Sequence, residues 1–259
     1  MQVKPRIPLI AGNWKMNLTR QQSLDLVNQI RFGLPNPGQV DVIIAPTFLH
    51  LSMLSDLLDN SYLSIAAQNL HHQDSGAFTG ECSGTFLKDV GTEYVIIGHS
   101  ERRTLFGETN DQIRKKTEAA FRHDLIPILC IGETLEEREN DCVETVLTEQ
   151  LAVLSERSTV QIAKMVIAYE PVWAIGTGKS ASPGQVDRVH ALIRSQLNQL
   201  AGSDSVRTRI LYGGSVKASN CRELFELPDV DGALIGGASL KASEFIEIVR
   251  LARIVHQSK

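Results

Sequence analysis

Five residues of this 259-residue chain carry side chains suited to acid–base or anion chemistry, each at or just after a short apolar run. They are Asn13, Lys15, His99, Glu101 and Glu170. A carboxylate, an imidazole and an ammonium group can together take up a proton and stabilise the negative charge left behind. The set therefore favours proton abstraction next to a carbonyl group.

Glu170 and His99 each have a second interpretation. Glu170 leads into Pro171 and then a long apolar and glycine-containing segment, which is typical of a base beneath a movable lid, but a carboxylate there also suits a structural salt bridge. His99 alone could be a satisfied core residue. Ser100 can cap a short helix over residues 101–103, however, and an imidazole at a helix N-terminus is biased toward the neutral form.

Two glycine pairs favour a phosphate site. Gly213 and Gly214 precede Ser215, and Gly236 precedes Gly237, each pair after one of the last two apolar runs. Glycines make tight turns, but they also let backbone N–H groups approach phosphate oxygens, and a following helix adds its positive end. Lys15 could anchor the phosphate, form a Schiff base or be a solvated lysine. A small phosphorylated substrate is expected.

Composition restricts the partners. The chain has 26 Lys and Arg against 30 Asp and Glu, which gives no indication of binding to nucleic acid or to an anionic membrane. The four cysteines (Cys82, Cys130, Cys142, Cys221) form no CxxC pair, so neither a metal site nor disulfides are expected. Cys130 is interpreted as a packing residue and His71-His72 as a surface pair. No cofactor is expected.

The N-terminal apolar stretch is short and suits a first strand better than a signal peptide. No apolar run approaches the ~18 residues of a membrane span. A soluble, cytoplasmic protein is expected.

The elements that must position these side chains repeat along the chain. Apolar runs that suit buried parallel strands are followed by amphipathic stretches. The runs are 7–12, 40–46, 63–69, 94–100, 126–133, 165–171, 208–214 and 232–237. Eight such units match an α/β protein with a closed (β/α)8 barrel of ~250 residues, one domain over residues 1–259. A doubly wound open sheet is the competing fold.

Local signals mark helices and loops. Ser182 with Pro183 and Gln185 forms a capping box, and Thr134 with Glu137 opens the preceding long helix in the same way. The last helix, after Ser243, carries a single apolar stripe, which consists of Phe245, Ile248, Val249, Ala252 and Val255. The connections 69–85 and 171–181 exceed the common strand-to-helix length, which is typical of functional loops.

Eight segments resemble the triosephosphate isomerase family, in order and over nearly the whole chain. They are AGNWKMN (11–17), AQN (67–69), GAFTGE (76–81), IIGHSERR (96–103), LCIGE (129–133), AYEPVWAIGTGK (168–179), LYGGSV (211–216) and DGALIGGASL (231–240). The resemblance implies interconversion of dihydroxyacetone phosphate and D-glyceraldehyde 3-phosphate in glycolysis and gluconeogenesis, through an enediolate.

The resemblance also implies roles for the site residues. Glu170 would be the base and His99 a neutral electrophile that polarises the carbonyl. Lys15 and Asn13 would stabilise the oxygens, and Glu101 would orient Lys15. The phosphate would meet the backbone N–H groups of Gly176, Ser215, Gly236 and Gly237.

Two loops complete the implied picture. The segment 171–181 would be a lid that includes Pro171 and Trp173. Ile175 on the lid and Leu234 beyond strand eight would form an apolar clamp around the base. The segment 69–85 would be the dimer loop of a homodimer, with Thr79 near the partner's lysine and histidine. Cys82, Gly84 and Ala233 depart from the family's usual residues, which puts the rigidity of the interface and the packing near strand eight in question.

Three other functions fit parts of the pattern. A barrel aldolase would use Lys15 or Lys164 as a Schiff base. A metal-dependent isomerase would need converging carboxylates and histidines at the strand ends. A catalytically inactive barrel would serve only as a binding partner.

Overall fold

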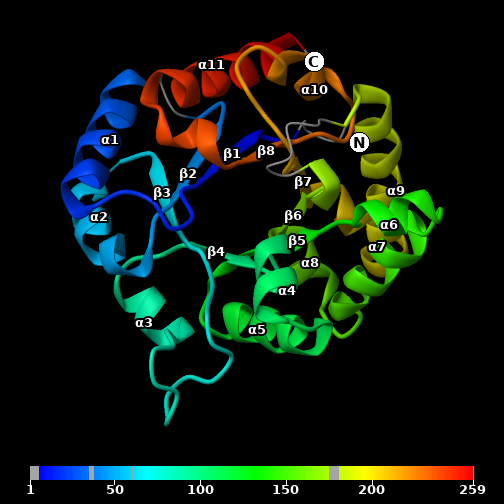
Figure 1. Ribbon diagram of the computed structural model, residues 1–259, viewed down its shortest axis with the longest axis horizontal. Coiled ribbons are helices and arrows are strands. Elements are labelled where there is room, and N and C mark those ends of the chain that lie inside the picture. Colours follow the sequence, from blue (N-terminus) through cyan, green and yellow to red (C-terminus); the bar gives the residue numbers. More distant parts are fainter. Residues whose placement is uncertain (1–5, 35–37, 60, 175–180, 259) are drawn as a thin grey trace.

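Eight parallel strands close into a barrel in sequence order, and β8 pairs with β1 to complete the ring (Figure 1). The computed structural model describes residues 6–34, 38–59, 61–174 and 181–258. The strands are β1 (Leu9–Asn13), β2 (Asp41–Ala45), β3 (Leu63–Ala67), β4 (Tyr94–Ile97), β5 (Ile126–Ile131), β6 (Val166–Tyr169), β7 (Arg209–Tyr212) and β8 (Gly232–Ile235). Closure excludes the open doubly wound sheet and confirms the predicted (β/α)8 barrel.

Helices form the outer layer around the strands (Figure 1). They are α1 (Arg20–Gly33), α2 (Leu51–Leu58), α3 (Gly84–Asp89), α4 (Ser100–Phe106), α5 (Asn110–Arg122), α6 (Leu135–Glu139), α7 (Val143–Leu151), α8 (Thr159–Lys164), α9 (Pro183–Ala201), α10 (Cys221–Glu226) and α11 (Ala242–Ser258). Short 3-10 turns include η3 (Val172–Ala174) and η5 (Gly237–Leu240). None of the helices in the described ranges combines the length and apolarity that crossing a membrane requires.

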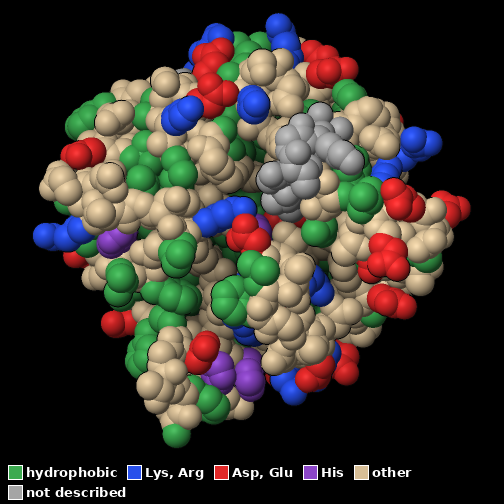
Figure 2. All heavy atoms as spheres, in the orientation of Figure 1, with side chains coloured by type: hydrophobic (Ala, Val, Ile, Leu, Met, Phe, Trp, Pro, Cys, Tyr) green, Lys and Arg blue, Asp and Glu red, His purple; other side chains and the backbone are tan. Residues whose placement is uncertain are grey.

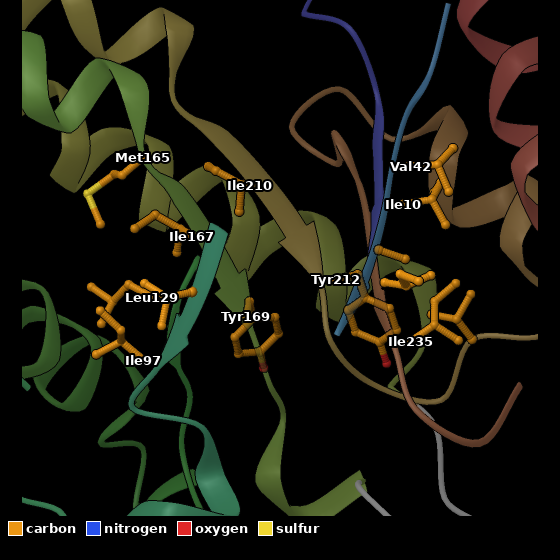
Figure 3. Close-up of a cluster of buried hydrophobic side chains, with 14 of the residues drawn as sticks. Ile10, Val42, Ile97, Leu129, Met165, Ile167, Tyr169, Ile210, Tyr212 and Ile235 are labelled. Carbon is orange, nitrogen blue, oxygen red and sulfur yellow. The ribbon is translucent and has the colours of Figure 1, made fainter. Parts of the chain in front are cut away.

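The strand side chains alternate between two apolar clusters, as the period of two along a strand requires. Leu9, Ala11 and Cys130 belong to the smaller cluster, inside the barrel. Ile10 and Leu129 belong to the larger one, between sheet and helices, part of which Figure 3 shows. The prediction that Cys130 is a packing residue is confirmed, and its burial raises the pKa of the thiol well above the usual value.

The predicted helix starts are confirmed, but one predicted helix is wrong. Capping boxes begin α6 at Thr134 and α9 at Ser182. The long helix expected after Thr134 is two helices, because α6 ends at Glu139 and Asp141 takes a left-handed φ of 56° before α7 starts. In the last helix all five residues of the predicted stripe are buried.

The connection between β3 and α3 stands out from the barrel. Residues 68–83 leave the carboxyl end of β3 and project away from the ring of helices, at the bottom of Figure 1. Residue 71 forms an isolated parallel bridge with residue 83, so the two ends of the projecting segment are tied together. The connection expected at 69–85 ends earlier than expected, because α3 begins at Gly84.

Candidate active site

The carboxyl ends of the strands surround a cavity of about 930 Å³. Figure 2 looks onto this rim of the barrel, where basic and acidic side chains meet beside a hollow. Predicted site residues that line the cavity are Asn13, Lys15, His99, Glu101, Glu170, Ser215, Leu234, Gly236 and Gly237. Residues separated by more than two hundred positions thus share one small volume, which is where barrels of this kind place their chemistry.

Glu170 and His99 touch each other. Glu170 follows the last residue of β6, and its Oε1 lies 2.9 Å from Nε2 of His99, which lies two residues past the end of β4. Its Oε2 accepts the backbone N–H of Ser100 at 2.9 Å. Burial opposes the charge of Glu170, but the adjacent imidazole and the Ser100 N–H outweigh it and lower the pKa of the carboxyl.

The ring of His99 is itself the cap of α4. The backbone N–H of Glu101 donates to Nδ1 of His99 at 3.2 Å, and Ser100 is the first residue of the helix, so the predicted capping role of Ser100 is wrong. Because Nδ1 accepts a hydrogen bond, Nε2 is the nitrogen that carries the proton in the neutral ring.

The pKa of His99 is raised in this arrangement. Burial lowers the pKa of the imidazole, but the contact with the Glu170 carboxylate more than compensates and raises it above the usual 6.5. The preference for neutrality expected from the helix N-terminus is therefore overridden while Glu170 touches the ring.

Lys15 sits in a strained backbone conformation, with φ of 52°. Its backbone N–H donates to Oδ1 of Asn13 at 3.0 Å, and its ammonium lies 2.5 Å from Oε1 of Glu101. Nε2 of Gln68 donates to the Lys15 carbonyl at 2.8 Å and to the Ala45 carbonyl at 2.9 Å, which fixes the turn. Gln68 was not among the predicted site residues, and its place in the AQN segment was the only signal for it.

Two glycines let other backbone segments approach Glu170. A Cβ on Gly132 would lie 1.8 Å from the Glu170 carbonyl oxygen, and a Cβ on Gly213 would lie 2.8 Å from Glu170 Cγ. A larger residue at either position would push the carboxylate out of place. Across the cavity, Gly237 begins the short turn η5. Ile175 and Gly176, predicted for the lid, lie outside the described residues.

The root of the predicted lid is held by a buried carboxylate. Oε1 of Glu133 accepts the Trp173 indole N–H at 2.8 Å, the Tyr169 hydroxyl at 3.1 Å and Nη1 of Arg138 at 2.8 Å. Glu133 is fully buried, and the Arg138 guanidinium lies over the Trp173 ring at 5.0 Å. Glu133 was not among the predicted site residues, although it closes the LCIGE segment. Pro171, two residues before Trp173, is also buried.

Other predicted residues lie apart from this cluster or inside the barrel. Leu234, expected beyond strand eight, is instead part of β8, where it packs in the barrel interior and lines the cavity. Thr79 is exposed on the projecting loop. Lys164, the alternative Schiff-base residue, ends α8, just before β6 begins, away from the carboxyl end of that strand. Within the described ranges, no three His, Cys, Asp or Glu side chains gather as a metal ion would require.

Comparison with known proteins agrees with this arrangement. The family model described as triosephosphate isomerase matches residues 8–252. A triosephosphate isomerase of Magnetococcus marinus is 50% identical over 249 residues, 94% of this chain and 98% of the relative. Those of Roseiflexus castenholzii (48% over 246 residues, 94% and 97%) and Nitrosococcus oceani (46% over 248 residues, 95% and 99%) are similarly close. With the match running through every strand of the barrel, the chain belongs to the triosephosphate isomerase family.

Proposed function

We propose that Glu170, His99, Lys15 and Asn13 carry out the reaction of this isomerase, the interconversion of dihydroxyacetone phosphate and D-glyceraldehyde 3-phosphate. The observation that supports these roles best is the 2.9 Å contact between Glu170 and His99 at the edge of a cavity that Lys15 also lines. A three-carbon substrate held there meets a base, a proton donor and a cation together. The reaction places the enzyme in glycolysis and gluconeogenesis.

The first step is a movement of Glu170. Its carboxylate leaves His99 and the Ser100 N–H and turns toward the substrate carbon next to the carbonyl. Both contacts lower the pKa of the carboxyl, while burial raises it, so leaving them makes Glu170 a stronger base. The carboxylate then takes the proton from that carbon, and the electron pair of the C–H bond moves onto the carbonyl oxygen.

The same movement prepares His99. Without the carboxylate beside it, burial and the start of α4 both oppose a charge on the ring, so the imidazole becomes neutral with its proton on Nε2. Nε2–H donates to the oxygen that gains charge and passes protons between the two substrate oxygens. Glu170 returns its proton to the neighbouring carbon, which completes the exchange with no net change in the enzyme.

Lys15 and Asn13 stabilise the charged oxygens. The Asn13 amide oxygen accepts the Lys15 backbone N–H. The amide nitrogen of Asn13 is therefore the group that can donate to a substrate oxygen. Glu101 holds the Lys15 ammonium at the cavity. A preorganised donor at a developing oxyanion is worth about 3–4 kcal/mol in enzymes that use one. The phosphate would be bound by the backbone N–H groups of Ser215, Gly236, Gly237 and Gly176.

The segment 171–181 would act as the lid. Trp173, anchored by Glu133, defines where it leaves the barrel. Ile175 and Leu234 would then press on the two sides of the Glu170 carboxylate. Closure would exclude water, which strengthens the electrostatic contacts and protects the enediolate from losing its phosphate.

The segment 69–85 would dock into a second copy of the chain to form a homodimer, with Thr79 near the partner's site. Support comes from large apolar side chains exposed on the loops at this end of the barrel. These are Met16 (92% exposed), Leu49 (91%) and Phe78 (43%). Monomeric proteins seldom leave such a group in water. A cytoplasmic enzyme that uses neither metal nor cofactor is proposed.

A coupled assay in both directions, with EDTA present, tests the activity. Full activity in EDTA and no adduct after borohydride with the triose phosphate are expected. Loss of activity restored by a divalent ion would favour the metal-dependent isomerase. A trapped adduct on Lys15 or Lys164 would favour the aldolase, and no activity at all the inactive barrel.

A further inference from the structure

Helix α5 holds the projecting loop at two points. At the root, the Lys116 ammonium donates to Oδ1 of Asn69 at 2.7 Å. Further out, Oδ1 of Asp74 accepts a hydrogen bond from Nη2 of Arg122 at 2.7 Å. The same oxygen lies 2.7 Å from Nε2 of His123. The loop therefore does not leave the body of the protein freely but is fixed along the C-terminal half of α5.

The Arg122 guanidinium binds the loop backbone as well. Its Nη2 donates to the His72 carbonyl at 2.9 Å. The pKa of Asp74 is lowered to about 2 by these hydrogen bonds from Arg122 and His123, so the carboxyl remains ionised at any pH at which the enzyme works. Both partners of Asp74 come from the last turn of α5 and its cap.

Gly84 leaves the room that His123 needs. A Cβ on Gly84 would lie 2.5 Å from Cδ2 and 3.0 Å from Cγ of the His123 ring. Gly84 is the first residue of α3, where an alanine backbone would be acceptable, so the glycine is needed for space alone. Gly84 was expected to make the interface less rigid, but its lack of a side chain is what leaves room for the His123 ring.

The contacts continue from the held segment to the tip of the loop. The His71 ring packs on His72 at 4.5 Å and on Phe78 at 4.2 Å between centroids. Its Nδ1 accepts the backbone N–H of Gln73 at 3.1 Å. Figure 2 shows histidine side chains grouped where the loop leaves the barrel. Holding residues 72–74 therefore also positions Phe78, next to Thr79.

We propose that Asp74, Arg122 and His123 form a clamp that holds this loop in the pose in which a second copy of the chain docks. The proposal rests on the dimer proposed above. A loop that is already ordered loses less conformational entropy when it enters a partner, so the clamp strengthens association without touching the partner. The histidine pair that the sequence analysis interpreted as plain surface belongs to this arrangement.

The variant Asp74→Asn tests the clamp, with Asp111→Asn as its matched control. Asp111 lies on the same helix, its side chain is 57% exposed against 50% for Asp74, and it also pairs with two basic residues, Arg114 and Lys115. The dimer dissociation constant is measured by analytical ultracentrifugation, and the activity is measured at several enzyme concentrations.

Asp74→Asn is expected to raise the dissociation constant about fivefold, the effect of one good exposed ion pair, and to regain wild-type activity at high enzyme concentration. Asp111→Asn should match the wild type. A wild-type dimer with an unchanged constant in Asp74→Asn would overturn the clamp. A wild-type protein that stays monomeric at all concentrations would overturn the dimer itself and the clamp with it.

A second test uses the fit between Gly84 and His123. Gly84→Ala should weaken association as Asp74→Asn does, because the new methyl group displaces the ring. In a His123→Ala background the same change should have no further effect. Equal effects of Gly84→Ala in both backgrounds would contradict the clamp, and circular dichroism establishes that each variant is folded.

Discussion

At the scale of single residues, the position of the Glu170 carboxylate is set by its surroundings. Its two oxygens are bound by His99 and by the Ser100 N–H, and the missing side chains of Gly132 and Gly213 give its backbone and its Cγ their places. The Glu170 residue is 2% exposed, so little water reaches it from outside the cavity. Because these contacts fix the position of the carboxylate, a small displacement of it should change its reactivity strongly.

The variant Glu170→Asp withdraws the carboxylate by one methylene. Since a displacement of about 1 Å from the reacting atom can cost about 100-fold in rate, kcat should fall by about 100-fold or more, with a much smaller rise in KM. Steady-state kinetics in both directions measure this. The same substitution at the half-buried Glu247, which is not among the residues that line the cavity, serves as the control. A wild-type kcat for Glu170→Asp would remove Glu170 from the role of base.

Titration of His99 gives a second prediction at this scale. The Glu170 carboxylate raises the pKa of the imidazole and burial lowers it, so Glu170→Gln should lower the His99 pKa below that in the wild type. Nitrogen NMR of the free enzyme measures both values. A His99 pKa that is equal in the two proteins would show that the carboxylate does not control the ring.

The pair also predicts how stability changes with pH. The raised pKa of His99 contributes stability below its usual 6.5 that is lost as pH rises through the folded value. The lowered pKa of Glu170 contributes above its usual 4.5 and is lost as pH falls. The stability lost in Glu170→Gln should therefore be largest between these two values and smaller at pH 9, as urea unfolding at several pH values will show.

The residue types of the site were predictable, because polar side chains at the ends of buried strands stand out in a sequence. The residues that hold these site residues in place could not be predicted from the sequence. Gln68 matters because Lys15 has a positive φ, and Glu133 because Trp173 and Tyr169 meet it from another strand end. Neither the positive φ of Lys15 nor the contacts of Glu133 can be recognised from the spacing of residues in the sequence.

At the scale of elements, the root of the proposed lid is held by the short helix α6. Arg138 of this helix pairs with Glu133 and stacks on Trp173, so β5, α6 and the root of the lid are joined by one buried carboxylate. The break after Glu139 that the sequence analysis missed leaves α6 as a separate five-residue helix. Capping boxes are readable from the sequence, whereas a single left-handed aspartate is not.

The variant Glu133→Gln tests this junction. It keeps the size of the side chain but leaves the Arg138 guanidinium without its buried partner, so the free energy of unfolding should fall by about 3 kcal/mol. Urea unfolding measures the change, and Glu136→Gln on the exposed face of α6 is the control. Equal stability of the two variants would show that Glu133 does not hold the junction together.

At the scale of the whole molecule, the barrel was predictable because eight apolar runs and their spacing allow few other folds. The surface proposed for a partner was harder to predict from the sequence. The clamp on the projecting loop joins residues 74 and 123, which no local sequence pattern connects. Even so, the glycine and the histidine pair that drew attention in the sequence both take part in it.

The variant Thr79→Arg should block the docking of a second copy. Light scattering should give a mass of about twice 28.5 kDa for the wild type and about one chain for the variant, with isomerase activity reduced in parallel. Lys88→Gln on α3 is a control that also changes the charge by one unit and lies outside the loop. A variant of Thr79 that remains a dimer would place the contact elsewhere.

Because the sheet closes on itself, every described strand already has a neighbour on both sides. Neither another protein nor a misfolded copy can extend it by adding a strand, the usual route to fibrous aggregates. Self-assembly must then use the loops and the helix surfaces, so changes in a few loop residues can create or abolish a complex while the backbone ladder of the barrel remains as it is.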